Sequence, residues 1–441
     1  MINVPNPGLS LLSHSIRLVT LSVLILSLNG CALMRNLQVE SWPFAGHPEE
    51  KIERNYFPVS SEDDVIGRLA VVRLHKGDTL PDIARHFSLG INEISSANPG
   101  VDIWVPGAGE RIILPLRFIL PDGPRKGIVI NLAAMRLFQY KRDGRSLVVS
   151  TYPVGVGSTE RPTPMGPTYV KRKVMRPVWH VPASISEDHR KKGDPLPSKV
   201  PPGPENPLGE YALYLNKSSY LIHGTNKPSS IGLRATNGCL RLFPEDIKRL
   251  YANTPVNTPV NIVYQPYLIG RSGELVYMEV HTPLEKSDPV ELEKAYAKLK
   301  NIEKRTARPL DWGKVKEALA QARGIPVPIF ELVEGNGKRS EETVEVRHPE
   351  KLYGKPEIPE LVMEAWYVLA ADLRNETDAV RLAAIINHQG PPIPARVISK
   401  GDNYRVIAGP FKDYSEARDA AKRLKIDLEI EGILIGPDGK K

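Results

Sequence analysis

At 441 residues the chain is too long for one compact domain, and roughly two to four domains are expected. Its apolar content of 41% and charged content of 25% are ordinary for globular domains, whereas its 41 prolines are about twice the average usage of roughly 5%, which predicts linkers and rigid loops. The net charge of +8 implies an anionic partner such as nucleic acid, membrane lipid or acidic cell-wall polymer, or simply solubility, and charge alone does not choose among them.

The first thirty residues have the pattern of an export signal. Residues 1–17 carry Arg17 and no acidic residue, and residues 18–28 form an apolar run too short to span a bilayer as a stable helix. The run ends in Leu28-Asn29-Gly30-Cys31, and an apolar core followed by a small residue and cysteine resembles the lipobox of bacterial lipoproteins. The resemblance implies a lipoprotein signal peptide at 1–30 and a lipid on Cys31; the alternative is an ordinary signal peptide with a chance cysteine.

The residue after the lipobox predicts which membrane would hold the protein. Ala32, not Asp, follows Cys31, and by resemblance to the sorting rule of enteric bacteria this implies the outer rather than the inner membrane. The expectation is a periplasmic protein anchored through its lipid. With Cys31 acylated, Cys239 has no disulfide partner in the chain, and a free thiol in an oxidising compartment favours a catalytic duty.

A tether and a small domain are predicted next. Residues 31–68 lack clear periodicity and are interpreted as a tether from the membrane. Residues 69–115 have the order β-α-α-β, with Gly77-Asp78-Thr79 as turn and helix cap and Asn98-Pro99-Gly100 ending the second helix. This pattern resembles the LysM module, which implies binding of N-acetylglucosamine-containing glycans. An unrelated small βααβ domain is the alternative.

Residues 124–266 are predicted to form a mostly-β domain, because short β runs alternate with Gly- and Pro-rich turn signals. The runs lie at 127–131, 136–140, 147–150, 211–215 and 260–264. One helix is predicted from Pro244 to Tyr251, since proline suits a first helical turn and Glu245-Asp246 suit the positive N-terminal end.

The chain changes character after this domain. Charged helical runs at 288–305 and 311–323, followed by the polar stretch 333–360, predict that residues 284–360 are a helical and flexible spacer, or helices packed onto the preceding domain.

Residues 364–437 are predicted to have the order βαββαβ of a ferredoxin-like domain. The run from Tyr404 to Phe411, followed by Ser415-Glu416-Ala417, resembles the SPOR domain, which implies binding of peptidoglycan glycan strands stripped of stem peptides. An RNA-recognition fold shares the element order, but its strand motif of the form Gly-aromatic-Gly/Ala-Phe-Val-x-aromatic is absent.

The chemistry is predicted to centre on Cys239, the only cysteine outside the N-terminal region, and on the upstream His223. A lone cysteine with a histidine within folding reach is a candidate nucleophile with its base, although a lone buried cysteine is more often a small hydrophobe. Gly238 allows close approach, and N–H groups near it could face an oxyanion. No Asp or Glu is close in sequence, so a backbone carbonyl is expected to orient His223.

Residues 127–264 resemble the L,D-transpeptidase catalytic domain of the YkuD family. The family signature is His-Gly, a gap, then Ser/Thr-His-Gly-Cys, an apolar residue and Arg or Asn; here it reads His223-Gly224 and Thr236-Asn237-Gly238-Cys239-Leu240-Arg241. The run 152–157, continuing to 163–166, fits the family's turn before the active-site sheet. Asn237 replaces the usual histidine, and asparagine can form hydrogen bonds but cannot titrate.

The resemblance implies a set of roles for the matched residues. Cys239 is the expected nucleophile, His223 the general base, and Gly224 supplies the carbonyl that orients it. Contacts to substrate or oxyanion are expected from Thr236, Asn237, Gly238 and Arg241. Arginine suits planar carboxylate recognition, so Arg241 either holds a substrate carboxylate or braces the loop.

The implied reaction is acyl transfer on peptidoglycan. The thiolate attacks the bond between meso-diaminopimelate and D-alanine of a tetrapeptide stem, D-alanine leaves, and a thioester forms on Cys239. An amine of a neighbouring stem then gives a 3–3 cross-link, a lipoprotein lysine gives wall anchoring, and water gives an L,D-carboxypeptidase. The sequence leaves the acceptor open.

Other readings are weighed against this one. No cofactor is expected, and a metal site is disfavoured because no histidine pair near Cys239 has zinc-ligand spacing. The run Lys171-Arg172-Lys173 is interpreted as a solvated strand edge or a contact to anionic wall, not a nucleic-acid patch. The alternative to an enzyme is a non-catalytic, lipid-anchored peptidoglycan tether, and Asn237 is the residue that keeps it open.

Overall fold

The computed structural model describes residues 52–60, 62–191, 193–217, 219–283, 289–332 and 343–437. The expected signal peptide at 1–30 and the expected lipidation site Cys31 lie outside these residues. Within the described ranges, no helix is both long and apolar enough to cross a membrane.

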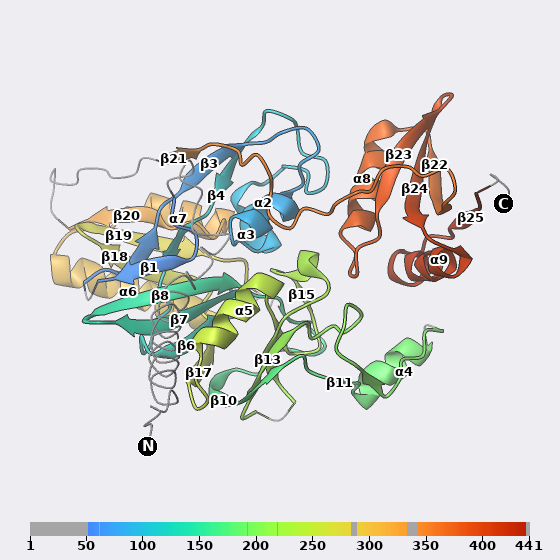
Figure 1. The fold of residues 1–441 in the computed structure, drawn as a ribbon. Helices are drawn as coiled ribbons and strands as arrows, with labels where there is room; N and C mark the ends of the chain where they lie inside the picture. The colour runs from blue at the N-terminus through green and yellow to red at the C-terminus, as the bar shows by residue number, and fades with distance from the viewer. Residues whose placement is uncertain are drawn as a thin grey trace, which may run out of the picture. The chain divides into compact units, whose positions relative to one another are not determined.

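The domain predicted at residues 124–266 is built on a nine-stranded sheet (Figure 1). The strand order is β1-β8-β7-β6-β17-β10-β13-β14-β16, and the pairs are antiparallel except β6–β17 and β14–β16. The bounds are β1 Tyr56–Val59, β6 Gly127–Asn131, β7 Arg136–Asp143, β8 Ser146–Pro153, β10 Gly166–Met175, β13 Tyr211–Leu215, β14 Leu221–His223, β16 Leu240–Arg241 and β17 Pro259–Val263. Two further short strands, β9 Val156–Gly157 and β15 Arg234–Thr236, pair with each other in parallel.

One helix covers part of this sheet, where the sequence predicted it. α5 runs from Pro244 to Asn253, with proline in its first turn and Glu245 and Asp246 at its N-terminal end. Ile247 and Leu250 are fully buried in the same apolar cluster as residues of β6, β13 and β17. The helix thereby closes the core on which the central strands rest.

Part of the segment expected to be a tether is built into the fold. β1 pairs with β8 in the nine-stranded sheet, and β2 (Val65–Gly67) pairs with β5 (Arg117–Ile119). Phe57 and Ile66 are buried within these strands. Strands of three or four residues are too short to show a recognisable alternation of apolar and polar residues in the sequence. The prediction of a tether is therefore wrong for β1 and β2.

The β-α-α-β order expected for residues 69–115 is present. β3 (Ala70–Arg73) pairs antiparallel with β4 (Arg111–Leu114), and α2 (Leu80–His86) and α3 (Ile91–Ala97) lie between them in the chain. The Thr79 hydroxyl caps α2 by accepting a hydrogen bond from the Asp82 amide.

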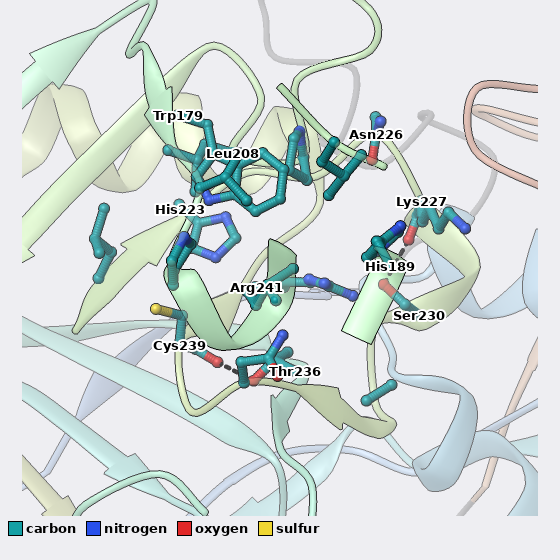
Figure 2. A pocket seen from close by; sticks show the side chains of 18 of the residues that line it. Trp179, His189, Leu208, His223, Asn226, Lys227, Ser230, Thr236, Cys239 and Arg241 are labelled. Atoms are coloured by element: carbon teal, nitrogen blue, oxygen red, sulfur yellow. Dashed lines mark hydrogen bonds between the residues drawn. The ribbon is translucent and has the colours of Figure 1, made fainter. Parts of the chain in front are cut away.

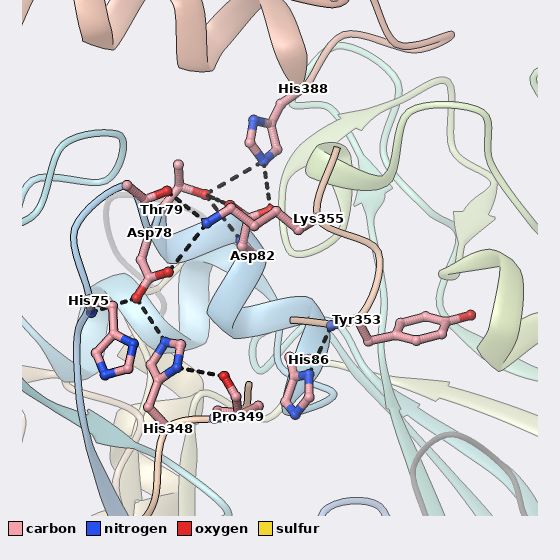
Figure 3. A network of polar contacts seen from close by, with 11 residues as sticks. His75, Asp78, Thr79, Asp82, His86, His348, Pro349, Tyr353, Lys355 and His388 are labelled. Carbon is pink, nitrogen blue, oxygen red and sulfur yellow. Dashed lines mark hydrogen bonds and ion pairs between the residues drawn. The ribbon is translucent and has the colours of Figure 1, made fainter. Parts of the chain in front are cut away.

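A distant segment completes this small domain. β21 (Val344–Val346) pairs in parallel with β3 and makes its sheet three-stranded. Beyond it, His348 Nε2 lies 2.8 Å from Asp78 Oδ2 and the Tyr353 amide lies 2.9 Å from His86 Nδ1 (Figure 3). Residues 344–353 are therefore folded onto the βααβ domain, although the sequence placed them in a flexible stretch.

The charged helices expected in the 284–360 segment are present as α6 (Pro289–Thr306) and α7 (Trp312–Gln321), but they do not form a spacer. They pack on an antiparallel sheet of β18 (Tyr267–Ser272), β19 (Leu275–Val280) and β20 (Val327–Glu331). Leu299, Val315 and Met278 are fully buried between the layers. The spacer interpretation failed because it overlooked β18 and β19, whose apolar faces require this cover.

The C-terminal domain confirms the predicted βαββαβ order. Its elements are β22 (Trp366–Leu373), α8 (Glu376–Asn387), β23 (Ala395–Lys400), β24 (Asn403–Phe411), α9 (Tyr414–Leu428) and β25 (Ile433–Ile435). The sheet order is β23-β24-β22-β25, with antiparallel pairs throughout. Asn375 and Asp413 cap the two helices by accepting hydrogen bonds from amides three residues on.

A buried ion pair joins the βααβ domain to the catalytic sheet. Arg136 of β7 donates from Nε and Nη2 to the two carboxylate oxygens of Glu93 on α3, at 2.6 and 2.7 Å. Arg136 Nη2 also donates to the Ser88 carbonyl at 2.9 Å, and Thr151 accepts from Nη1. Because the Arg136 side chain is only 1% exposed, each charge depends on the other for compensation.

Glu93→Gln should therefore lower the free energy of unfolding by about 3–5 kcal/mol, the usual cost of leaving one buried charge without its partner. Urea denaturation followed by tryptophan fluorescence measures it. Glu357→Gln is the matched control, because Glu357 pairs with Lys351 on the surface, and its midpoint should equal that of the parent chain. Equal midpoints for both variants would show that the Arg136–Glu93 pair contributes nothing.

Candidate active site

The parallel pairing of β14 and β16 brings the predicted nucleophile and base together. Ile222 is opposite Leu240 and His223 is opposite Arg241, so Cys239, one residue before β16, lies beside Leu221. The chain achieves this by looping back through residues 224–238, which lets both strands run in one direction. His223 and Cys239 line the same pocket (Figure 2).

The same pocket wall includes three of the other predicted residues, Thr236, Asn237 and Arg241. Gly224 and Gly238 are not among the residues that line it. A Cβ at Gly224 would lie 3.1 Å from the Ile247 side chain, and the close packing of this turn onto α5 therefore favours glycine.

His223 is buried and uncharged. The residue is 4% exposed, and Nδ1 lies 2.7 Å from the Gly224 carbonyl oxygen. A neutral ring that donates its Nδ1 proton to this carbonyl leaves Nε2 as a hydrogen-bond acceptor. Burial, together with the positive charge of Arg241, lowers the pKa of His223 to about 3. The orienting group is thus the backbone carbonyl that the sequence suggested.

Cys239 is held as a thiol. Its side chain is half-buried, and Sγ lies 3.6 Å from the Ser219 carbonyl oxygen. Burial raises the pKa of the Cys239 thiol, and the Leu221 amide and the Arg241 charge offset this only in part. The resting pair is therefore a neutral thiol and a neutral imidazole, not a thiolate–imidazolium ion pair.

Thr236 and Gly238 shape the turn that presents the thiol. The Thr236 hydroxyl donates to the Cys239 carbonyl at 2.6 Å and accepts from the Gly238 amide at 3.1 Å. Gly238 has a φ of +96°, and a Cβ there would lie 2.7 Å from the Tyr220 ring. Both its conformation and its surroundings require glycine.

Asn237 is exposed and has a partner that the sequence did not reveal. Its Oδ1 accepts a hydrogen bond from Arg161, and Arg161 Nη2 lies 2.6 Å from Asp188 Oδ2. Asp188 belongs to α4 (Ala183–Lys191), which was not predicted. The helix sits in an excursion at 177–207 together with the paired strands β11 (Trp179–His180) and β12 (Lys199–Val200). Arg161 thus ties the catalytic turn to this excursion.

Arg241 braces the loop through its backbone, and its side chain is a buried cation. Its backbone braces the loop by exchanging hydrogen bonds with Gly155, at 2.9 and 3.0 Å. Its Nε is buried without a hydrogen-bond partner, and no carboxylate in the described part of the chain pairs with its guanidinium. Burial lowers the pKa of Arg241. An unpaired buried cation favours an incoming anion.

The protonation states can be tested without a substrate. In a Cys31→Ser background, iodoacetamide should alkylate Cys239 at a rate that rises about tenfold per pH unit between roughly pH 6 and 8, because only the thiolate reacts. Arg241→Gln should slow alkylation, since the Arg241 charge lowers the thiol pKa. Mass spectrometry of the intact chain gives the rates. A rate independent of pH over this range would instead reveal a preformed thiolate.

Comparisons with known proteins agree with this geometry. Residues 125–262 match the family described as L,D-transpeptidase catalytic domain (YkuD), and residues 363–436 match the SPOR domain. The chain is 41% identical over 216 residues to the probable L,D-transpeptidase ErfK/SrfK of Escherichia coli K12, covering 48% of this chain and 68% of that protein. It is 36% identical over 277 residues to the probable L,D-transpeptidase YbiS of the same strain, covering 60% and 88%.

Among solved structures, an L,D-transpeptidase from Mycobacterium smegmatis aligns with a TM-score of 0.25 and 20% identity, covering 35% of this chain and 63% of that one. The sequence relatives establish the family independently of this alignment: this chain belongs to the L,D-transpeptidases and also carries a SPOR domain.

Proposed function

We propose that this L,D-transpeptidase acts through a cysteine thioester, with Cys239 as nucleophile and His223 as general base. The observation that carries the proposal is the pairing of β14 with β16, which sets His223, hydrogen-bonded to the Gly224 carbonyl, and the thiol of Cys239 in one pocket. A neutral imidazole can accept the thiol proton as the sulfur attacks.

The reaction then proceeds in two balanced steps. Sγ of Cys239 bonds to the carbonyl carbon of the diaminopimelate–D-alanine bond while His223 takes the thiol proton. The C–N bond breaks, His223 returns that proton to the departing amine, and D-alanine leaves a thioester on Cys239. An acceptor amine next attacks the thioester and gives a proton to His223, and the thiolate leaves and is reprotonated.

Two negative charges in this reaction need stabilisation. The leaving D-alanine carries a free carboxylate beside the scissile bond, and the unpaired guanidinium of Arg241 supports its binding there. The oxyanion of the tetrahedral intermediate needs N–H donors. The Gly238 amide is already bonded to Thr236, so the Cys239 amide is the better donor.

The remaining assignments extend the proposal to the whole chain. Cys31 carries a lipid that places the enzyme in the periplasm at the outer membrane, and residues 69–115 bind glycan as a LysM-like domain. The SPOR match at 363–436 supports peptidoglycan as the partner. An amine acceptor gives 3–3 cross-links or anchors a protein to the wall, and water in its place gives L,D-carboxypeptidase activity.

The nucleophile is tested with a disaccharide-tetrapeptide donor and the full chain. Intact-mass spectrometry should show release of D-alanine and a thioester adduct, both absent from Cys239→Ala, and His223→Gln should slow adduct formation at least about 100-fold. Adding an amine acceptor or omitting it separates transpeptidation from hydrolysis. D-alanine release by Cys239→Ala would overturn Cys239 as the nucleophile, and no release by the parent chain would overturn the enzyme and leave the non-catalytic tether.

The pH dependence tests the base. His223 acts only when neutral, and because its pKa is lowered to about 3, kcat/KM should show no inflection between about pH 5.5 and 7.5, where an ordinary histidine titrates. Arg241→Gln removes a charge that lowers this pKa, so its acid limb should move toward neutrality. An inflection near pH 6.5 in the parent chain would contradict the neutral-base mechanism.

A further inference from the structure

The strand register extends the catalytic wall away from the thiol. Arg172 of β10 is opposite Tyr214 of β13, and Tyr214 is opposite Leu221 of β14. Paired residues on neighbouring strands point to the same face of a sheet. Leu221 lies beside Cys239, so one row of side chains leads across four strands from the nucleophile to Arg172, and every member of the row lines the pocket.

Arg172 stands out in this row as a cation without a counter-ion. Its guanidinium carbon lies 3.5 Å from the centre of the Tyr214 ring, and its side chain is exposed. No carboxylate pairs with it in the part of the chain that the structure describes. Arg161, by contrast, is already committed to Asp188 and Asn237.

The ring under Arg172 is fixed by the active site itself. Tyr214 packs in one apolar cluster with Cys239, Trp179, Leu208 and Leu221. Stacking on a ring that is held in this way restrains the planar guanidinium, so less side-chain entropy is lost when it binds a carboxylate. The arrangement resembles a prepared binding group more than a solvated charge on a strand.

The spacing fits a peptide donor. Neighbouring strands lie about 4.8 Å apart, so Tyr214, two strands from the row position of Cys239, is about 10 Å from it along the row. An extended peptide covers about 3.3–3.6 Å per residue, and about three residues therefore span this distance. The diaminopimelate and glutamate residues on the acyl side of the scissile bond cover about two of these lengths, and their side chains together with that of Arg172 cover the rest.

We propose that Arg172, stacked on Tyr214, binds a carboxylate of the donor stem other than the one on the leaving D-alanine. The inference rests on the proposed transpeptidase function and adds substrate recognition to it. Two stem groups carry this chemistry, the free carboxylate of the diaminopimelate side chain and that of the glutamate residue. Arg241 holds the carboxylate beside the scissile bond, and Arg172 would hold the stem at a distance from it.

The test uses the full chain and three tetrapeptide donors: the unmodified peptide, one amidated at the diaminopimelate side chain, and one amidated at glutamate. A hydrogen bond to a charged group is worth about 1.5–3 kcal/mol, so Arg172→Gln should raise KM about 10- to 100-fold with kcat nearly unchanged. The parent chain should lose a similar factor on one amidated donor, and Arg172→Gln should lose nothing further on it.

Two variants separate charge from structure. Lys171→Ala removes the same charge from the neighbouring residue, which is exposed and outside the pocket lining, and its KM should equal that of the parent chain. Arg172→Lys keeps the charge but not the planar stack and should recover part of the affinity. If Arg172→Gln matched the parent chain on all donors, or lost as much on both amidated donors as on the unmodified one, the proposal would fail.

Peptide binding to Cys239→Ala, measured by calorimetry, keeps this test independent of turnover. If the parent chain releases no D-alanine, the proposed reaction fails, but the unmodified peptide should still bind Cys239→Ala more tightly than it binds the Cys239→Ala/Arg172→Gln double variant. Equal affinities of the two would overturn the role of Arg172 whether or not the enzyme is active.

Discussion

The parallel contact between β14 and β16 is the constraint on which this active site depends. It places His223 against Arg241 and Leu221 against Cys239, so a single strand pairing sets Cys239, His223 and Arg241 in register. Two glycines support this contact. The Gly224 carbonyl oxygen is hydrogen-bonded to the His223 ring. The positive φ of Gly238 turns the chain into β16. The rest of the domain keeps these two short strands aligned.

Desolvation then sets the chemistry of the pair. Burial acts in opposite directions on an acid and a base, and here it raises the pKa of Cys239 and lowers that of His223. Both groups rest uncharged, although the cation of Arg241 lies beside them. The resting site therefore holds no thiolate–imidazolium ion pair.

Much of this could be predicted from the sequence, because the decisive residues are local. Cys239 and His223 stood out as one thiol and one histidine within a short stretch, and the βαββαβ order of the last domain followed from clear periodicity. The Arg161–Asn237 contact and the Arg172–Tyr214 stack could not be predicted, since they join residues 76 positions apart or belong to separate strands whose register only the fold defines. The helices α6 and α7 were predicted, but the sheet of β18 to β20 on which they pack was not.

The strand β21 has a mechanical consequence. It leads toward the SPOR domain, yet it is hydrogen-bonded in parallel to β3, and the residues after it contact Asp78 and His86. Tension applied through the C-terminal domain would therefore reach β3 as a shearing force along the paired strands, and the contacts to Asp78 and His86 would share that load.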